Sequence, residues 1–218
     1  MIQLSNVTKT FVTDGLETCV ARDVTLCFPA GASVALLGRN GAGKSSLLRM
    51  IAGTMRPTSG EVIVSGNVSW PVGFAGSFHG DLTGLQNTRF VARVYGVDSD
   101  QLVRFVAGFS ELGDKFFLPV RGYSQGMRAR LGFSLSMGIS FDTYLIDEVT
   151  AVGDGAFRGK CETTLAERLA SRSAIVVSHS LGFLQRVCDA GVVIENGRAA
   201  WFDDVSEAIA VHKKNLGI

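Results

Sequence analysis

The pattern of apolar and polar positions predicts an α/β protein. Apolar runs of strand length lie at residues 33–37, 174–177 and 192–194, and they have the continuity of strands that are buried on both faces. Residues 46–52 follow the first run with the spacing of a helix that Gly53 can end. Strands alternating with helices favour a parallel sheet.

Other segments show the alternation of half-buried antiparallel strands. Ile2 and Leu4 begin one such segment, and residues 61–64 form another. A third has apolar residues at every second position: Val24, Leu26 and Phe28. These segments predict a small antiparallel layer beside the parallel sheet. Asn196-Gly197, between two further short apolar runs, predicts a tight hairpin.

Helical spacing dominates the middle of the chain. One apolar helix face is predicted from positions three and four apart, namely Leu102, Phe105, Val106, Phe109 and Leu112. A later helix has an apolar residue at every fourth position: Phe157, Cys161, Leu165 and Leu169. We therefore expect one domain over residues 1–218, in which residues 1–75 and 141–218 form the sheet core and residues 76–140 an inserted helical lobe.

The composition excludes several classes of protein. The 21 lysines and arginines nearly balance the 20 aspartates and glutamates, so no basic field indicates nucleic acid as a partner. No stretch approaches the roughly 20 apolar residues of a membrane span, and no secretory leader is evident. The four cysteines lack metal-site spacing and are interpreted as reduced cytosolic thiols, most of them buried. Contact with a membrane would then depend on a partner.

The stretch between the first strand and its helix has the glycine spacing of a phosphate-binding loop. The candidate nucleotide-binding residues are Gly38, Arg39, Asn40, Gly41, Ala42, Gly43, Lys44, Ser45 and Ser46. In this motif, backbone N–H groups at a helix N-terminus surround phosphate. Lys44 would reach the terminal phosphates as a catalytic residue, and the Ser45 hydroxyl would bind Mg²⁺. A chance glycine-rich turn is the alternative, but the strand before it and the helix after it favour nucleotide binding.

Two acidic residues end the apolar run at residues 143–146. Adjacent side chains of a strand point to opposite faces, so Asp147 and Glu148 can have different roles. Asp147 is a candidate Mg²⁺ ligand, and Glu148 is a candidate base for the water that attacks the γ-phosphate. The alternative is a pair of solvated acids at a strand end.

His179 follows the run at 174–177, again at the end of a strand where ligands of open α/β sheets bind. It is a candidate for a hydrogen bond that reports the presence of the γ-phosphate. The alternative is a histidine with a structural role only. His79 and His212 are interpreted as surface or packing residues.

Ser124 and the residues after it predict a capped helix in which Met127, Leu131 and Leu135 share a face. With the phosphate loop before it and the acidic strand and His179 after it, this stretch resembles the signature of the ATP-binding cassette family. The stretches VSWPVGF, LTG, YSQGMRARLGF and DEVTAVGD are similar to those of ATPase subunits of capsular-polysaccharide exporters of the polysialic-acid type. The resemblance covers residues 1 to about 205.

The resemblance implies a P-loop NTPase fold (RecA-like), with an antiparallel β-subdomain and an inserted helical subdomain. It further implies an ATPase with ATP and Mg²⁺ that works as a homodimer. Ser124 and Gly126 of one copy would face the γ-phosphate held by Lys44 of the other, and Asp154 would lie across the same interface. Phe11 occupies the position that stacks on adenine, although a core phenylalanine is the alternative.

Two features depart from the family pattern. The usual glutamine that contacts magnesium is not evident in residues 70–79, and Gln86, the nearest, falls at a predicted helix start. Gln125 and Met127 stand where most cassettes have Gly and Gln. Trp70 is interpreted as a packing residue, with contact to a permease as the alternative.

The implied function is to drive capsular polysaccharide across the inner membrane. The subunit would lie at the cytoplasmic face, held by a transmembrane permease and connected through it to periplasmic and outer-membrane export components. The alternatives are an O-antigen or teichoic-acid exporter subunit and a non-transport cassette. A small phosphotransferase or GTP switch would leave the YSQGM stretch unexplained.

Overall fold

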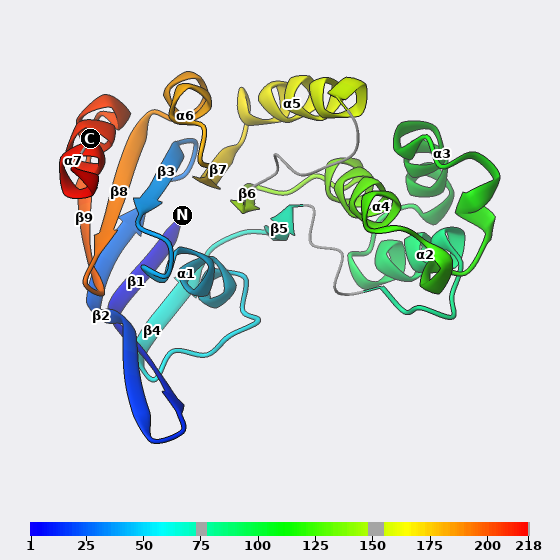
Figure 1. The fold of residues 1–218 in the computed structure, drawn as a ribbon. Helices are drawn as coiled ribbons and strands as arrows, with labels where there is room; N and C mark the ends of the chain where they lie inside the picture. Colours follow the sequence, from blue (N-terminus) through cyan, green and yellow to red (C-terminus); the bar gives the residue numbers. More distant parts are fainter. Residues whose placement is uncertain (73–77, 148–154, 218) are drawn as a thin grey trace. The chain divides into compact units, whose positions relative to one another are not determined.

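The computed structural model describes residues 1–72, 78–147 and 155–217 (Figure 1). Contacts between residues divide the chain into two compact units. The first, here called the core unit, comprises Met1–Pro71, Phe141–Glu148 and Arg168–Ile218. The second, the helical unit, comprises Val72–Ser140 and Val149–Glu167, so it also takes in residues that the sequence analysis assigned to the core.

The larger sheet of the core unit has six strands in the order β5-β6-β7-β3-β8-β9. Pairs β6/β7, β7/β3 and β3/β8 are parallel, while β8 and β9 form an antiparallel hairpin. The strands are β3 (Ser33–Gly38), β5 (Val68–Val72), β6 (Thr143–Asp147), β7 (Ser173–Val177), β8 (Ala190–Glu195) and β9 (Arg198–Phe202). The hairpin predicted at Asn196-Gly197 is confirmed, with φ of 50° and 78° at these residues.

Both faces of β3 are covered, which explains its continuous apolar sequence. Val34 and Leu36 belong to the core cluster that includes residues of α1 (Lys44–Ile51). Alternate residues point the other way, toward α7 (Val205–Leu216), which contacts β3 and β8. The remaining helix of this unit is α6 (Leu181–Val187).

A second, three-stranded sheet confirms the predicted antiparallel layer. Its order is β2-β1-β4, formed by β1 (Ile2–Thr13), β2 (Leu16–Phe28) and β4 (Ser59–Val64). Leu4 and Val24 are among the residues that it buries in the shared core cluster. Both β1 and β2 are longer than the alternation indicated, because they form a long hairpin around Asp14-Gly15, whose φ angles are 50° and 79°.

The helical unit is built from α-helices and two short 3₁₀ segments. They are α2 (Gly84–Val94), α3 (Ser99–Ser110), η1 (Gly113–Phe117), η2 (Val120–Gly122), α4 (Gln125–Gly138) and α5 (Gly155–Leu169). The sequence predicted that the apolar face of α3 continues to Leu112, but the helix ends two residues earlier. Glu111 adopts a left-handed conformation (φ 55°) that ends the helix at Ser110.

The four cysteines are free thiols. Burial raises the pKa of Cys161 and of Cys188 to about 12, so both remain protonated and unreactive. Cys27 is exposed, and Cys19 is partly exposed. The expectation that most of the cysteines are buried was therefore wrong, because β2 turns alternate residues to solvent.

Candidate functional site

The glycines of the loop between β3 and α1 are required by its backbone path. Gly41 and Gly43 have φ of 81° and 101°, in the left-handed region that favours glycine. A Cβ on Gly43 would lie 2.5 Å from the Val20 carbonyl oxygen, and one on Gly38 would lie 2.6 Å from that of Ile194. Neighbouring strands thus approach the loop so closely that only glycine fits at these two positions.

The N-terminus of α1 has no side-chain cap, unlike five other described α-helix starts. Gly43 is its N-cap residue, and no side chain accepts from the first N–H groups of the helix. Side chains of Thr83, Asp98, Ser124, Ser180 and Asp204 fill this role for α2, α3, α4, α6 and α7. The helix also has no acidic residue in its first turn. The dipole and the N–H groups of this terminus therefore suit an anion.

Lys44 curls back over the loop. Its Nζ donates to the carbonyl oxygens of Gly38 at 2.7 Å and of Arg39 at 3.0 Å. The ammonium group thus lies on the concave side of the loop, where phosphate oxygens can replace the carbonyls as its acceptors.

The remaining loop residues are accessible to a ligand. Arg39, Asn40, Gly41 and Ser45 are exposed, while Ala42 and Ser46 are partly buried. The Ala42 N–H donates to the Arg39 carbonyl at 3.0 Å, which closes a tight turn. Ser45 lies in the first turn of α1, directly after Lys44.

The ends of the parallel strands place further candidates on the same edge of the sheet. Asp147 ends β6, and His179 follows β7, which lies between β6 and β3. Gly38 ends β3. Parallel strands direct their carboxyl ends to one edge, so these residues share the edge that carries the loop. Glu148 and Asp154 lie outside the described residues.

A cavity of about 170 Å³ joins the loop to the end of β7 and to α7. Lys44, Ser178, His179 and His212 are among its lining residues. His212 is buried, which agrees with the packing alternative, and it also lines the cavity of the loop, which sequence reasoning missed. Burial and the nearby Lys44 cation lower the pKa of His212, partly opposed by the Glu195 carboxylate, so the imidazole is neutral at pH 7.

The chemistry of Ser45 and Asp147 fits magnesium. A hydroxyl and a carboxylate are oxygen donors of the kind that Mg²⁺ prefers, and Mg²⁺ usually takes few protein ligands and keeps water and substrate phosphates. No group of three or more His, Cys, Asp and Glu side chains that could hold a metal occurs in the described part of the chain. Two oxygen donors suit a metal whose other ligands are water and phosphate.

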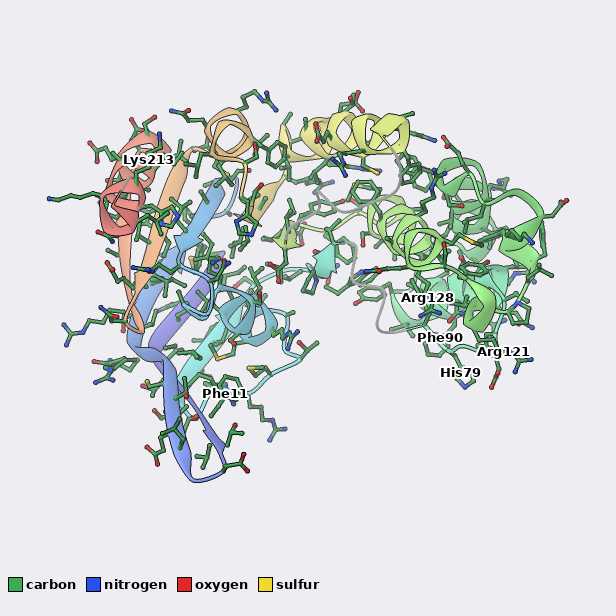
Figure 2. All side chains as sticks on the ribbon, in the orientation of Figure 1. Phe11, His79, Phe90, Arg121, Arg128 and Lys213 are labelled. Carbon is green, nitrogen blue, oxygen red and sulfur yellow. The ribbon has the colours of Figure 1, made fainter. Side chains whose placement is uncertain are left out.

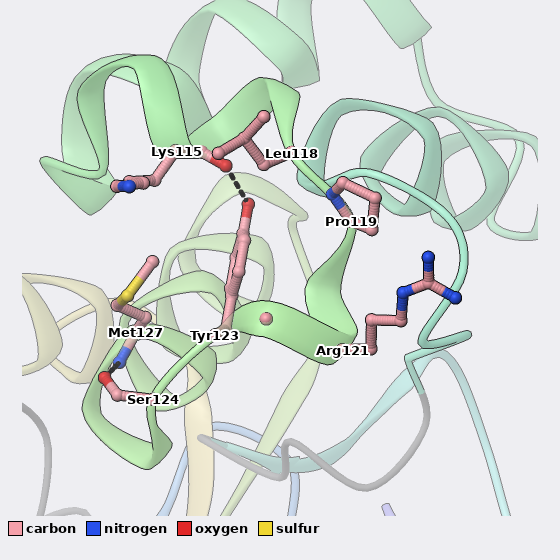
Figure 3. A pocket seen from close by; sticks show the side chains of 8 residues that line it. Lys115, Leu118, Pro119, Arg121, Tyr123, Ser124 and Met127 are labelled. Carbon is pink, nitrogen blue, oxygen red and sulfur yellow. Dashed lines mark hydrogen bonds between the residues drawn. The ribbon is translucent and has the colours of Figure 1, made fainter.

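The signature residues lie at the start of α4 in the helical unit. The Ser124 hydroxyl accepts from the Met127 N–H at 3.2 Å, which confirms the predicted N-cap (Figure 3). Both residues line an open pocket of about 460 Å³, whose wall includes Lys115 and Arg121. Tyr123 closes one side of it by donating to the Lys115 carbonyl at 2.7 Å. Within the described ranges, a Cβ on Gly126 would meet only the Ser124 hydroxyl, at 3.9 Å.

Phe11 lies near the tip of the β1–β2 hairpin (Figure 2). It is 36% exposed, so it is not the core phenylalanine of the alternative interpretation. The Lys9 ammonium lies 5.1 Å from its ring centroid. An exposed ring on the core unit is available for stacking, which stays a prediction.

The contacts of Gln86 and Trp70 give each of these residues a structural role. Gln86 forms a reciprocal capping box with Thr83: its side-chain oxygen accepts from the Thr83 N–H at 2.9 Å, and its N–H donates to the Thr83 hydroxyl at 3.1 Å. This glutamine therefore has a structural role at the start of α2. Trp70 packs edge-to-face on Phe141, with ring centroids 5.4 Å apart, which agrees with its interpretation as a packing residue.

Comparisons with known proteins agree with this geometry. Residues 21–151 match the family described as ABC transporter. The chain is 46% identical to "Polysialic acid transport ATP-binding protein KpsT" of Escherichia coli, over 98% of this chain and 96% of that protein. It is 45% identical to "Capsule polysaccharide export ATP-binding protein CtrD" of Neisseria meningitidis serogroup B, over 95% and 96%. Proteins named for O-antigen export are more distant, at 37% identity.

The fold also matches solved structures. A dimeric ATP-binding cassette in a post-hydrolysis state, bound to ADP and Pi, superposes with a TM-score of 0.79 over 94% of this chain and 99% of that one. The sequences of the two are 19% identical, so the likeness is one of fold.

Proposed function

The chain belongs to the ABC transporter family as an ATP-binding ATPase subunit, and from this premise we propose that it powers the export of capsular polysaccharide. The observation that carries the proposal is the identity of 45–46% over nearly the full length of relatives named for polysialic acid transport and capsule polysaccharide export. The lower identity to O-antigen export proteins ranks that function second.

In the proposed reaction, the loop and the uncapped start of α1 bind the phosphates of ATP. Lys44 exchanges the carbonyls of Gly38 and Arg39 for phosphate oxygens. Ser45 and Asp147 would hold Mg²⁺, which neutralises phosphate charge when bound. Glu148 orients and deprotonates the attacking water, and His179 contacts the γ-phosphate from the end of β7. Phe11 stacks on the adenine.

We propose that the working form is a homodimer. Ser124 and Gly126 of one copy would contact the γ-phosphate bound by the other, and Asp154 would lie at the same interface. The open space around Gly126 supports this, since none of the residues that the structure describes requires a glycine there.

A membrane permease is the proposed second partner. No helix in the described ranges is long and apolar enough to span a bilayer. The helical unit carries large apolar side chains that solvent reaches, among them Phe90 (61% exposed, Figure 2) and Phe117 (58%). Such side chains support docking to another protein. The subunit would then lie peripherally at the cytoplasmic face of the inner membrane, joined through the permease to the periplasmic and outer-membrane export components.

Replacement of Glu148 tests the proposal. Glu148→Gln keeps the shape of the side chain but removes its base, so we expect ATP to bind while turnover falls at least about 100-fold, equivalent to roughly 2.7 kcal/mol of barrier. The variant should accumulate as an ATP-bound dimer in sedimentation velocity. Normal turnover would exclude Glu148 from the mechanism, and a strictly monomeric ATP complex would exclude the homodimer.

The exported substrate requires a separate experiment in cells. In a strain that lacks the gene, the wild-type gene should restore surface capsule, whereas the Glu148→Gln gene should not. Loss of O-antigen with capsule retained would instead favour the second candidate function.

A further inference from the structure

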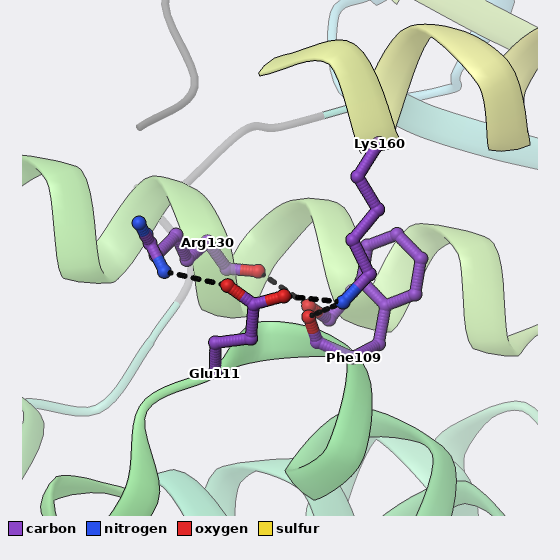
Figure 4. Close-up of polar contacts among 5 residues, drawn as sticks. Phe109, Glu111, Arg130 and Lys160 are labelled. Carbon is purple, nitrogen blue, oxygen red and sulfur yellow. Dashed lines mark hydrogen bonds and ion pairs between the residues drawn. The ribbon is translucent and has the colours of Figure 1, made fainter. Parts of the chain in front are cut away.

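Three helices of the helical unit meet at one cluster of charged and aromatic side chains, here called the helix clamp. It consists of Glu111 after α3, Arg130 on α4, Lys160 on α5 and Phe109 (Figure 4), together with Phe157. One Glu111 oxygen lies 2.7 Å from the Lys160 ammonium, and the other lies 3.4 Å from Arg130 Nη1. A single carboxylate therefore bridges α4 and α5.

Aromatic rings fix the two cations from a second side. The Arg130 guanidinium lies 4.4 Å from the Phe157 ring centroid, and the Lys160 ammonium lies 4.5 Å from that of Phe109. The two rings are packed edge-to-face, 5.9 Å apart. Lys160 also donates to the Phe109 carbonyl at 3.0 Å. Each cation thus has both a charged and an aromatic partner, and its position is determined by more than one contact.

The backbone at Glu111 indicates that its carboxylate has a purpose beyond ending α3. Its φ of 55° lies in the left-handed region, where glycine or asparagine is favoured after a helix. A glycine would end α3 with less strain. The presence of a glutamate is therefore explained by the two ion pairs and not by the turn.

Fold stability alone does not require such a cluster. The Arg130 side chain is only 17% exposed. Glu111 and Lys160 are 49% and 35% exposed, so their ion pair adds little stability, whereas a charged network can favour one relative arrangement of the elements that carry it. The cluster is thus better suited to fixing the orientation of α4 and α5 than to adding stability.

The two joined helices both begin at residues assigned to the dimer interface. Ser124 caps α4 and Gly126 lies in its first turn. Residue Gly155, the first of α5, directly follows Asp154 in the sequence. Resting on the proposed homodimer, we propose that Glu111, Arg130 and Lys160 are positioning residues, which hold α4 against α5 so that the signature end of α4 meets the partner's nucleotide in one orientation. They contact no nucleotide themselves.

The test uses ATP-driven dimerisation in the Glu148→Gln background. Adding Lys160→Met or Glu111→Gln should weaken the dimer at least about tenfold in sedimentation velocity, within the range of coupling energies between contacting residues. ATP affinity of the dilute monomer, from fluorescent-nucleotide titration, should stay unchanged because the phosphate loop belongs to the core unit. The double variant should lose less affinity than the sum of the two single losses, since both changes remove the Glu111–Lys160 ion pair.

Two controls separate positioning from folding. Lys160→Arg keeps the cation and should keep most of the dimer affinity. Arg158 is an exposed cation of the same helix and has no ion pair or hydrogen bond to the described residues. Arg158→Met should therefore leave the dimer affinity unchanged. Thermal unfolding of every variant shows whether the helical unit stays folded.

The possible outcomes are distinct. Dimerisation of full strength in both Lys160→Met and Glu111→Gln would overturn the inference and leave the proposed function standing. A loss of dimer that only accompanies a loss of folding or of monomer ATP affinity would also overturn it, because the clamp would then be merely structural. Failure of Glu148→Gln itself to dimerise would overturn the proposed homodimer and the inference with it.

Discussion

The N-termini of α1 and α4 are both assigned to phosphate, yet they are built differently. Helix α1 starts after Gly43 with no side-chain cap, while a lysine from its own first turn lies over the loop. Helix α4 starts after Ser124, whose hydroxyl already accepts one of its N–H groups. The first terminus is therefore an anion site made by one chain. The second is capped by its own serine and borders a pocket with Lys115 and Arg121, and in the proposed homodimer it would meet a nucleotide bound by the other copy.

The glycines at the two termini show the same contrast. A side chain on Gly43 would clash with the Val20 carbonyl, and its φ of 101° disfavours any other residue. Among the described residues, a Cβ on Gly126 has one neighbour, 3.9 Å away, and its φ is not in the left-handed region. The described part of the fold thus explains the first glycine but not the second, which agrees with the proposed approach of another copy.

The largest expected effect comes from removing the lysine of the first terminus. Lys44→Ala should weaken ATP binding at least about 100-fold, roughly 2.7 kcal/mol, because a charge-assisted contact to the phosphates is lost. Alanine is a good helix former, so α1 should persist and the circular dichroism spectrum should not change. Fluorescent-nucleotide titration measures the affinity, and Lys213→Ala, an exposed cation of α7 (Figure 2), is the control. Unchanged affinity in Lys44→Ala would contradict the assignment of α1 to phosphate.

The two glycines give the next prediction, in which activity and stability change in opposite directions. Gly126→Ala should stabilise α4 by about 0.5–1 kcal/mol, since alanine restricts the unfolded chain. It should nevertheless lower ATP turnover at least about tenfold, because the new methyl group occupies the space assigned to the partner's phosphate. Differential scanning calorimetry and a phosphate-release assay measure the two effects.

Gly43→Ala should behave differently, since its clash lies within the chain. Both its melting temperature and its ATP affinity should fall. If Gly126→Ala retained full turnover, the second terminus would have no role in hydrolysis.

Features set by neighbouring residues were predictable from the sequence. The apolar run of β3, the Asn196-Gly197 turn and the Ser124 cap each depend on a few adjacent positions, and all three are confirmed. The long β1–β2 hairpin was missed, although Asp14-Gly15 is a turn signal of the same kind.

Features set by distant residues were not predictable. His212 continues the buried face of α7, and its sequence neighbours give no sign that Lys44 shares its cavity. The helix clamp likewise joins residues that are far apart in the sequence, and Glu111 is an ordinary acid until its backbone conformation is known. Contacts of this kind depend on the tertiary structure, which local patterns do not encode.

The smallest expected effect separates the two roles of Ser124. Ser124→Ala removes a helix cap, which should cost about 1 kcal/mol and lower the melting temperature by about 2–4 °C. Asp98 is a matched control, because its side chain caps α3 of the same unit by accepting from the Gln101 N–H at 2.6 Å. Asp98→Ala should lose similar stability and keep its turnover. Ser124→Ala should also lose about threefold or more in turnover, if the hydroxyl leaves its own helix for the partner's γ-phosphate. Equal turnover in the two variants would show that Ser124 acts only as a helix cap. The N–H groups of α4 would then be the phosphate contacts at the start of this helix.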